Sequence, residues 1–246
     1  MSTLQCLRAH PPGASPCRET SGRELVVTLA KERTLPPRPL LRGVLHQAAF
    51  VVALLVGAAL VLAAHGTRES VAAAVFAGSV VAMLALSALY HRIVWSPRSR
   101  LWMRRADHGG IYLLIAGTYT PIGLLDLRGQ TEQIVLAVVW IGAAAATLMR
   151  FFWPRAPNWL SAAVCIGLGW VGVAALPQLE HSAGLTAVVL LTAGGIAYTA
   201  GGIIYALRRP DPLPAVFGYH EVFHALTLVA IACQYVAIAF FVVRVG

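Results

Sequence analysis

The chain has 246 residues, of which 58% are hydrophobic and 12% are charged, and its mean hydropathy is +0.72. Soluble domains carry about 25% charged residues, so this composition excludes an ordinary soluble domain and also excludes intrinsic disorder of the whole chain. The net charge of +9 would suit a nucleic-acid partner only on a soluble basic face, which this composition does not provide. The sequence therefore indicates an integral membrane protein without a nucleic-acid partner.

The N-terminal segment, residues 1–42, differs in composition from the rest of the chain. It holds six of the 14 prolines and much of the charge, and the first long apolar stretch begins only after it. We expect a largely disordered cytosolic tail, in which residues 23–33 could form a short interfacial helix.

Seven apolar segments follow the tail, each close to the length of about 20 residues that a helix needs to cross a bilayer. A transmembrane β-barrel would instead show alternating segments of about ten residues. The sequence predicts an all-α membrane domain, residues 43–246, built as a bundle of seven transmembrane helices. The expected spans are residues 44–64, 71–90, 109–125, 134–152, 160–176, 183–207 and 220–243.

The basic residues are divided unequally between the two ends of this bundle. Sixteen precede the first span or lie in the second, fourth and sixth loops, whereas the opposite face has only three: Arg68, Arg128 and Arg244. Lys and Arg accumulate on the cytoplasmic side of membrane proteins. We therefore predict a multi-pass protein of the plasma (inner) membrane, with a cytosolic N-terminus and an external C-terminus. Membrane lipid is its environment and a candidate substrate, and the sequence indicates no protein partner.

Four ionisable residues mark a candidate site, because such residues inside membrane segments usually face the bundle interior. His91 closes the second span, Asp107 opens the third, and His220 and His224 open the seventh, so all four lie at cytosolic depth. A spacing of four residues rotates by about 400°, which places His220 and His224 on one helical face. Three imidazoles and a water form a zinc site of catalytic type, with Asp107 placed to orient or deprotonate that water.

The remaining polar residues near the spans have less specific interpretations. Ser87 lies one turn before His91, and helix packing alone could explain it. Glu221 could orient the metal ligands without binding the metal itself, pair with a cytosolic arginine or act as a base. Arg150 is expected to extend its charge to the membrane surface. Histidines at helix ends are usually interfacial, which is the interpretation for His46, His65, His108 and His181.

Residues 220–224 read HEVFH and match the HExxH motif, which in zinc metalloproteases places two ligands and a general-base glutamate on one helix. An intramembrane protease is therefore an alternative function. It would need a third ligand, for which Asp107 and Asp211 are candidates, and no second protease signature accompanies the motif.

Four segments of the chain are distinctive as a set: RPLLRGVLHQ (38–47) ahead of the first span, SALYH (87–91), DHGGIYLLIAGTYTP (107–121) and FGYHEVFH (217–224). Taken together, these segments resemble the haemolysin III family. This is the bacterial branch of the progestin and adipoQ receptor group, within a wider set of membrane hydrolases that includes alkaline ceramidases. The resemblance implies zinc ligation by His91, His220 and His224, a metal-bound water held by Asp107, and assistance from Ser87. It also implies seven helices with the N-terminus inside.

Two classes of function follow. The first is a zinc-dependent hydrolase that cleaves a lipid amide or ester in the cytosolic leaflet, with Asp107 as general base and Tyr112, Thr118 and Tyr119 as candidates to line the lipid cavity. The second is a cytolytic or channel-like protein with a structural metal, which the family's name implies. A receptor would rest on analogy alone.

Overall fold

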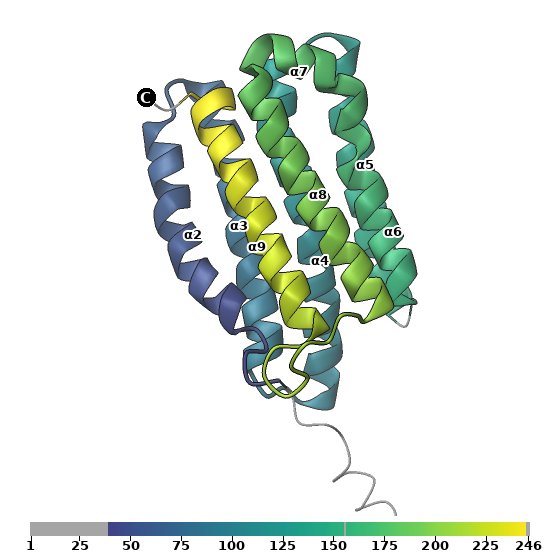
Figure 1. Cartoon of the computed structure of the whole chain (residues 1–246). Coiled ribbons are helices and arrows are strands. Elements are labelled where there is room, and N and C mark those ends of the chain that lie inside the picture. Colours follow the sequence, from purple (N-terminus) through teal and green to yellow (C-terminus); the bar gives the residue numbers. More distant parts are fainter. Residues whose placement is uncertain (1–38, 155, 245–246) are drawn as a thin grey trace, which may run out of the picture. The chain divides into compact units, whose positions relative to one another are not determined.

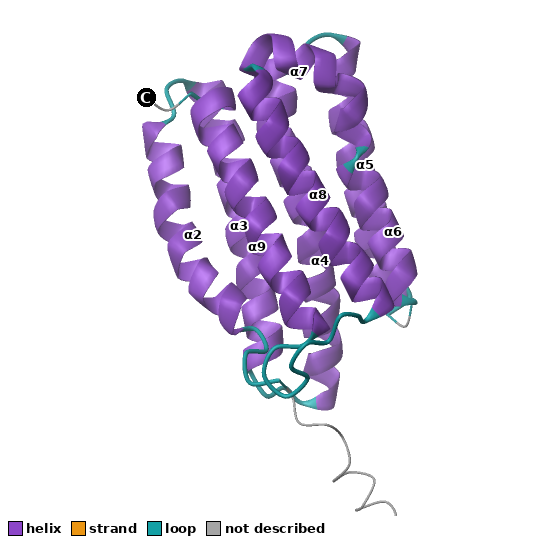
Figure 2. Ribbon diagram, in the orientation of Figure 1, coloured by secondary structure: helices purple, strands orange, loops and turns teal. Residues whose placement is uncertain are grey.

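The structure is a computed structural model that describes residues 39–154 and 156–244. Within these ranges every regular element is a helix, as Figure 2 shows, and the β-bridge between Leu213 and Phe217 stands alone. The prediction of an all-α protein is therefore confirmed. The expected polar tail, residues 1–42, falls outside the described residues except for its last positions, 39–42.

The helices run side by side as long rods that alternate in direction (Figure 1). Two π-helical turns, η2 (Ile122–Asp126) and η4 (Ile238–Val242), extend α4 and α9, and a 3-10 turn, η3 (Val171–Ala175), separates α6 from α7. The described α-helices are α2 (Val44–Ala63), α3 (Thr67–Arg92), α4 (Pro97–Pro121), α5 (Gln130–Phe152), α6 (Asn158–Gly169), α7 (Leu176–Ala183), α8 (Leu185–Leu207) and α9 (Tyr219–Ala237).

Among the described residues, six helical stretches are long and apolar enough to cross a bilayer. Large aliphatic side chains on their outer faces are exposed, including Leu55, Leu62 and Ile141. A soluble bundle rarely displays so much contiguous apolar surface, whereas a bilayer solvates it. The stretches are Val44–Ala63, Thr67–Arg92, Gln130–Phe152, Asn158–Ala183, Leu185–Leu207 and Tyr219–Val242.

Helix α4 differs in composition, because its first half carries four arginines and Asp107. It begins at Pro97, well before the predicted apolar segment at residue 109, and it packs along α3. The early start has a local cause: proline suits the first helical position, and the Ser96 hydroxyl accepts a hydrogen bond from the Ser99 N–H at 3.3 Å. Asp107 consequently lies inside a helix whose direction is already fixed, and not at its free end.

The fifth predicted span, residues 160–176, is not one continuous helix. Helix α6 ends at Gly169, and the chain passes through η3 before α7 begins at Leu176. The Tyr119 hydroxyl on α4 stabilises this break, because it donates to the Gly169 carbonyl at 2.6 Å and accepts from the Gly172 N–H at 2.9 Å. A Cβ at residue 172 would lie 2.8 Å from the Tyr119 ring, so glycine is required for this approach.

Small residues allow the helices that carry the polar side chains to approach closely. A Cβ at Gly117 of α4 would lie 2.1 Å from the Ser79 Oγ on α3, and one at Gly201 of α8 would lie 3.2 Å from the Phe223 ring on α9. Close approach of this kind is how membrane helices gain packing energy where lipid removes the hydrophobic driving force. The pairs α3–α4 and α8–α9 are therefore held in fixed register.

Replacing Tyr119 with phenylalanine tests the helix break. The change leaves the Gly169 carbonyl and the Gly172 N–H without their partner in an apolar interior, so we expect the free energy of unfolding to fall by about 1–3 kcal/mol. Thermal unfolding in detergent, followed by circular dichroism, measures this loss. Tyr90→Phe is the control, because that half-buried ring at the end of α3 contacts Arg100 through its face. Equal stability of the two variants would contradict the role given to the Tyr119 hydroxyl.

Candidate metal centre

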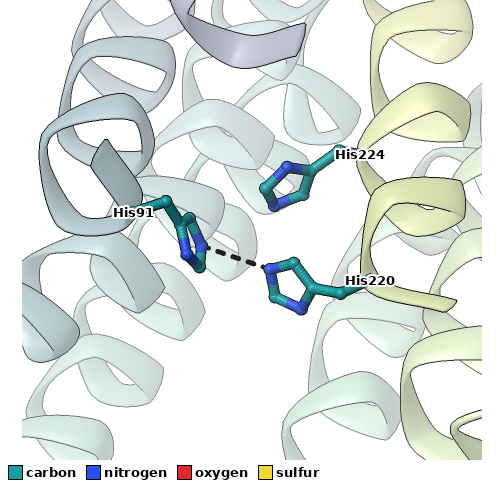
Figure 3. A group of neighbouring side chains, drawn as sticks. All are labelled: His91, His220 and His224. Carbon is teal, nitrogen blue, oxygen red and sulfur yellow. Dashed lines mark hydrogen bonds between the residues drawn. The ribbon is translucent and has the colours of Figure 1, made fainter. Parts of the chain in front are cut away.

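Three histidines from two helices meet where α3 ends and α9 begins (Figure 3). His91 lies in the last turn of α3, and His220 and His224 lie in the first turns of α9. The Nε2 atoms of His91 and His220 are 3.2 Å apart, and one nitrogen from each of the three rings lies within 4.8 Å of the others. The structure thus brings together the three histidines that the sequence analysis selected.

The three nitrogens suit a metal ion of the zinc type. Zinc binds imidazole nitrogen at about 2.0–2.1 Å, so two nitrogens on one ion lie at most about 4.2 Å apart. The His91–His220 distance of 3.2 Å already satisfies this limit, and a small rotation of side chains would bring the spread of 4.8 Å within it. The buried His224 Nδ1 has no hydrogen-bond partner among the described residues, so no protein group competes for it.

The Asp107 carboxylate lies beside this group of nitrogens. Its Oδ2 is 3.9 Å from the His91 Nε2, and the carboxylate faces the Ser87 hydroxyl. Arg104 lies one turn earlier on the same helix. The carboxylate is therefore placed to accept a proton next to the histidines without replacing any of them.

His46 is the functional candidate that sequence reasoning misplaced. It was expected at the membrane surface, but its side chain is 2% exposed and its Nδ1 lies 2.8 Å from the Ser87 Oγ. Its ring also stacks on the His224 ring, with centroids 3.8 Å apart and planes 15° from parallel. The signal that could have found it is depth: in the predicted topology His46 enters the first span at the same cytosolic level as the other three histidines.

The other histidines expected at the surface divide into two kinds. His65 and His181 are exposed, as predicted. His108 instead accepts a hydrogen bond at its Nδ1 from the Arg150 guanidinium at 2.9 Å, and Arg150 also donates to the Ala156 carbonyl. Arg150 is 2% exposed, so the expectation that it extends to the membrane surface is wrong: two neutral acceptors inside the bundle hold its charge.

Glu221 is fully buried beneath the metal centre, and both of its carboxylate oxygens are bonded. Oε1 pairs with the Arg42 guanidinium, and Oε2 accepts the Gly218 N–H at 2.9 Å, which caps the N-terminus of α9. Of the roles considered for Glu221, the structure shows pairing with an arginine, Arg42. The protease alternative needs this carboxylate as a free general base, and these two bonds occupy it.

An apolar cavity of about 180 Å³ opens from the metal centre into the bundle. His46, Ser87, Asp107 and His224 line one end, and Leu127, Leu176 and Leu179 lie at the other. The three residues proposed from sequence as lining, Tyr112, Thr118 and Tyr119, all border it. A polar end that includes His220 and His224 therefore continues into a long apolar chamber.

Residues 36–235 match the family model described as "Haemolysin-III related". "Hemolysin-3" of Bacillus cereus is 32% identical over 72% of this chain and 78% of its own length, and the "Hemolysin-3 homolog" of Bacillus subtilis is 30% identical over 70% and 77%. The "Heptahelical transmembrane protein ADIPOR2" of rice (Oryza sativa subsp. japonica) is 29% identical over 67% of this chain and 79% of its own length.

The matched region begins just before α2 and ends within α9, so it contains His46, Ser87, His91, Asp107 and both histidines of α9. The rice relative fits the link to the progestin and adipoQ receptor group that the sequence motifs implied. The chain belongs to the haemolysin III–related family of multi-pass membrane proteins.

Proposed function

We propose that the protein is a zinc-dependent hydrolase of a lipid amide or ester, with the metal held by His91, His220 and His224. One observation carries the proposal: three imidazole nitrogens lie within 4.8 Å of one another at the polar end of an apolar cavity inside the bundle. A cavity that is apolar along its length and polar at one end fits a substrate with an acyl chain and a polar scissile bond. A structural metal site alone would not need the chamber.

When bound, zinc would polarise the substrate carbonyl and lower the pKa of a water to about 7. The chain's own residues supply the remaining steps. The Asp107 carboxylate takes the proton of the attacking water and later returns it to the leaving amine or alcohol. The Ser87 hydroxyl faces Asp107 and fixes the direction of its carboxylate. The apolar walls around Tyr112 and Thr118 hold the acyl chain and keep other water out.

The membrane topology of this proposal has seven spans, which are the six long apolar stretches and, third in chain order, α4. The site lies at the cytosolic side. The six apolar stretches and α4 run side by side, and a related rice protein is named heptahelical. The end of the bundle that carries the histidines also carries Arg42, Arg92 and the arginines at the start of α4. The unequal distribution of basic residues then favours a cytosolic N-terminus and a plasma-membrane location.

The name of the Bacillus relatives favours a second candidate, a lytic or channel-like protein in which the metal is structural. This function would need the metal for folding only, and Asp107 would have no proton to accept. The two candidates therefore differ in what a change at Asp107 does, as described below.

The topology is tested with reporter fusions. Alkaline phosphatase fused after Gly246 should be active and a fluorescent protein at the same site should be dark, because each reporter folds on only one side of the inner membrane. The same reporters fused after Arg209, in the loop before α9, should give the reverse pattern. A fluorescent C-terminal fusion would contradict the proposed orientation.

Removing one imidazole tests the metal site. The variants His91→Ala and His224→Ala each leave two of three ligands, so we expect bound zinc to fall from about one equivalent per chain to near zero. Elemental analysis of protein purified in detergent measures it. His181→Ala, which changes an exposed histidine of α7, should retain the full equivalent. Wild-type protein that holds no zinc after purification without chelators would overturn the proposed site.

A substitution at Asp107 distinguishes a catalytic metal site from a purely structural one. Asp107→Asn keeps the size of the side chain but removes the proton acceptor, so hydrolysis of a fluorescent N-acyl lipid amide or its ester analogue should fall about 10²- to 10⁴-fold with zinc retained. The control is Glu180→Gln, which changes an exposed carboxylate on α7 and should hydrolyse the lipid at the wild-type rate. Two results together would favour the lytic candidate. The wild-type protein would hydrolyse neither lipid, and the wild-type protein and the Asp107→Asn variant would release dye from vesicles to the same extent.

A further inference from the structure

The start of α2 contacts each element that carries the metal centre. Arg42 pairs with the buried carboxylate of Glu221 on α9. Gly43 has φ +78°, and a Cβ there would lie 2.6 Å from the Cβ of His91 on α3, so this backbone packs directly against a proposed ligand. One turn later, His46 enters the site itself.

His46 makes two different contacts, each with a residue of the proposed mechanism. Its Nδ1 is hydrogen-bonded to the Ser87 hydroxyl at 2.8 Å, and its ring face covers the ring of His224. The side chain is almost fully buried and borders the cavity. A histidine that served only to anchor a helix at the membrane surface would be accessible and would need neither contact.

Ring geometry argues that His46 is not a fourth metal ligand. Imidazole binds a metal through a lone pair in the plane of its ring, so two rings on one ion must have planes that meet at that ion. The His46 and His224 rings are stacked 3.8 Å apart and 15° from parallel, so an ion in the plane of one ring lies far outside the plane of the other. The group of nitrogens that converge accordingly comprises His91, His220 and His224.

We propose that His46 is a positioning residue with two separable actions. Its ring holds the His224 imidazole in the orientation that binds the metal, and its Nδ1–H aligns the Ser87 hydroxyl with Asp107. The first action depends only on the metal site, and the second rests on the proposed hydrolase function.

The direction of the hydrogen bonds follows from counting donors. The proposed mechanism uses Asp107 as a base, and its ionised carboxylate then accepts hydrogen bonds only, so the single proton of the Ser87 hydroxyl points at it. Ser87 then receives a hydrogen bond from His46, which requires the neutral tautomer with the proton on Nδ1. The result is a chain in which His46 donates to Ser87 and Ser87 donates to Asp107, so the orientation of the base is set from α2.

Two substitutions at residue 46 separate the actions. His46→Phe keeps an aromatic ring to stack on His224 but cannot donate to Ser87. His46→Asn places an amide N–H near the position of the Nδ1–H but has no ring. Supporting residues around metal ligands typically contribute about 10- to 100-fold to metal affinity or to activity.

The expected results are opposite for the two variants. His46→Asn should bind zinc about 10- to 100-fold more weakly, by competition with a chelator, and keep the wild-type kcat once zinc is saturating. His46→Phe should keep zinc affinity within about threefold but lose about 10- to 100-fold in kcat with KM unchanged. In a Ser87→Ala background, His46→Phe should cause no further loss of kcat, because the residue through which it acts is already gone.

Several outcomes overturn the inference. Equal losses of zinc affinity and kcat in both variants would indicate general destabilisation, which thermal unfolding beside the exposed-site control His181→Phe would detect. Full zinc affinity in His46→Asn would contradict the proposed stacking action. An additive loss of kcat on adding His46→Phe to Ser87→Ala would contradict the proposed alignment of Ser87. A wild-type protein that binds zinc but hydrolyses no lipid overturns the hydrolase function and the alignment action, while the zinc measurements still decide the stacking action.

Discussion

The structure depends on one constraint, which is the free-energy cost of burying polar side chains inside a bundle that faces lipid. Each ionisable group within the hydrocarbon layer must find a partner inside the protein. Arg150 meets the His108 imidazole and a backbone carbonyl, and Glu221 meets Arg42 and the N-terminus of α9. The three converging histidines bring their nitrogens together beside the Asp107 carboxylate, an arrangement that a bound cation would satisfy well.

Helix direction and the position of each polar residue along its helix explain why these groups meet at one end. His91 is near the end of α3, and His220 and His224 are at the start of α9, so antiparallel packing brings them to the same level. Backbone hydrogen bonds fasten the chain beneath them: the N–H groups of Leu40 and Leu41 donate to the carbonyls of Ala215 and Val216. The site is thus assembled from helices distant in sequence but locked together at one end of the bundle.

Much of this arrangement could be predicted from the sequence because it depends on quantities that the sequence carries directly. Apolar segment lengths predicted the helices, and the i, i+4 spacing predicted the shared face of His220 and His224. The break after Gly169 could not be predicted, since it depends on a hydroxyl from Tyr119, fifty residues away in sequence. The burial of Arg150 was missed for the same reason, because its acceptor His108 lies on another helix.

The misplacement of His46 shows where reasoning from single residues stops. A histidine at a helix end is usually interfacial, and each such residue considered alone supports that interpretation. His46 differs because its neighbours differ: Gly43 lets the backbone approach His91, and Arg42 is drawn to Glu221. These contacts leave the imidazole between Ser87 and His224. The start of α2 closes this side of the site, and most of the residues that line the cavity belong to α4, α6 and α8. Under the proposed hydrolase function, the acyl chain of the substrate would therefore lie along these three helices and enter between helices other than α2.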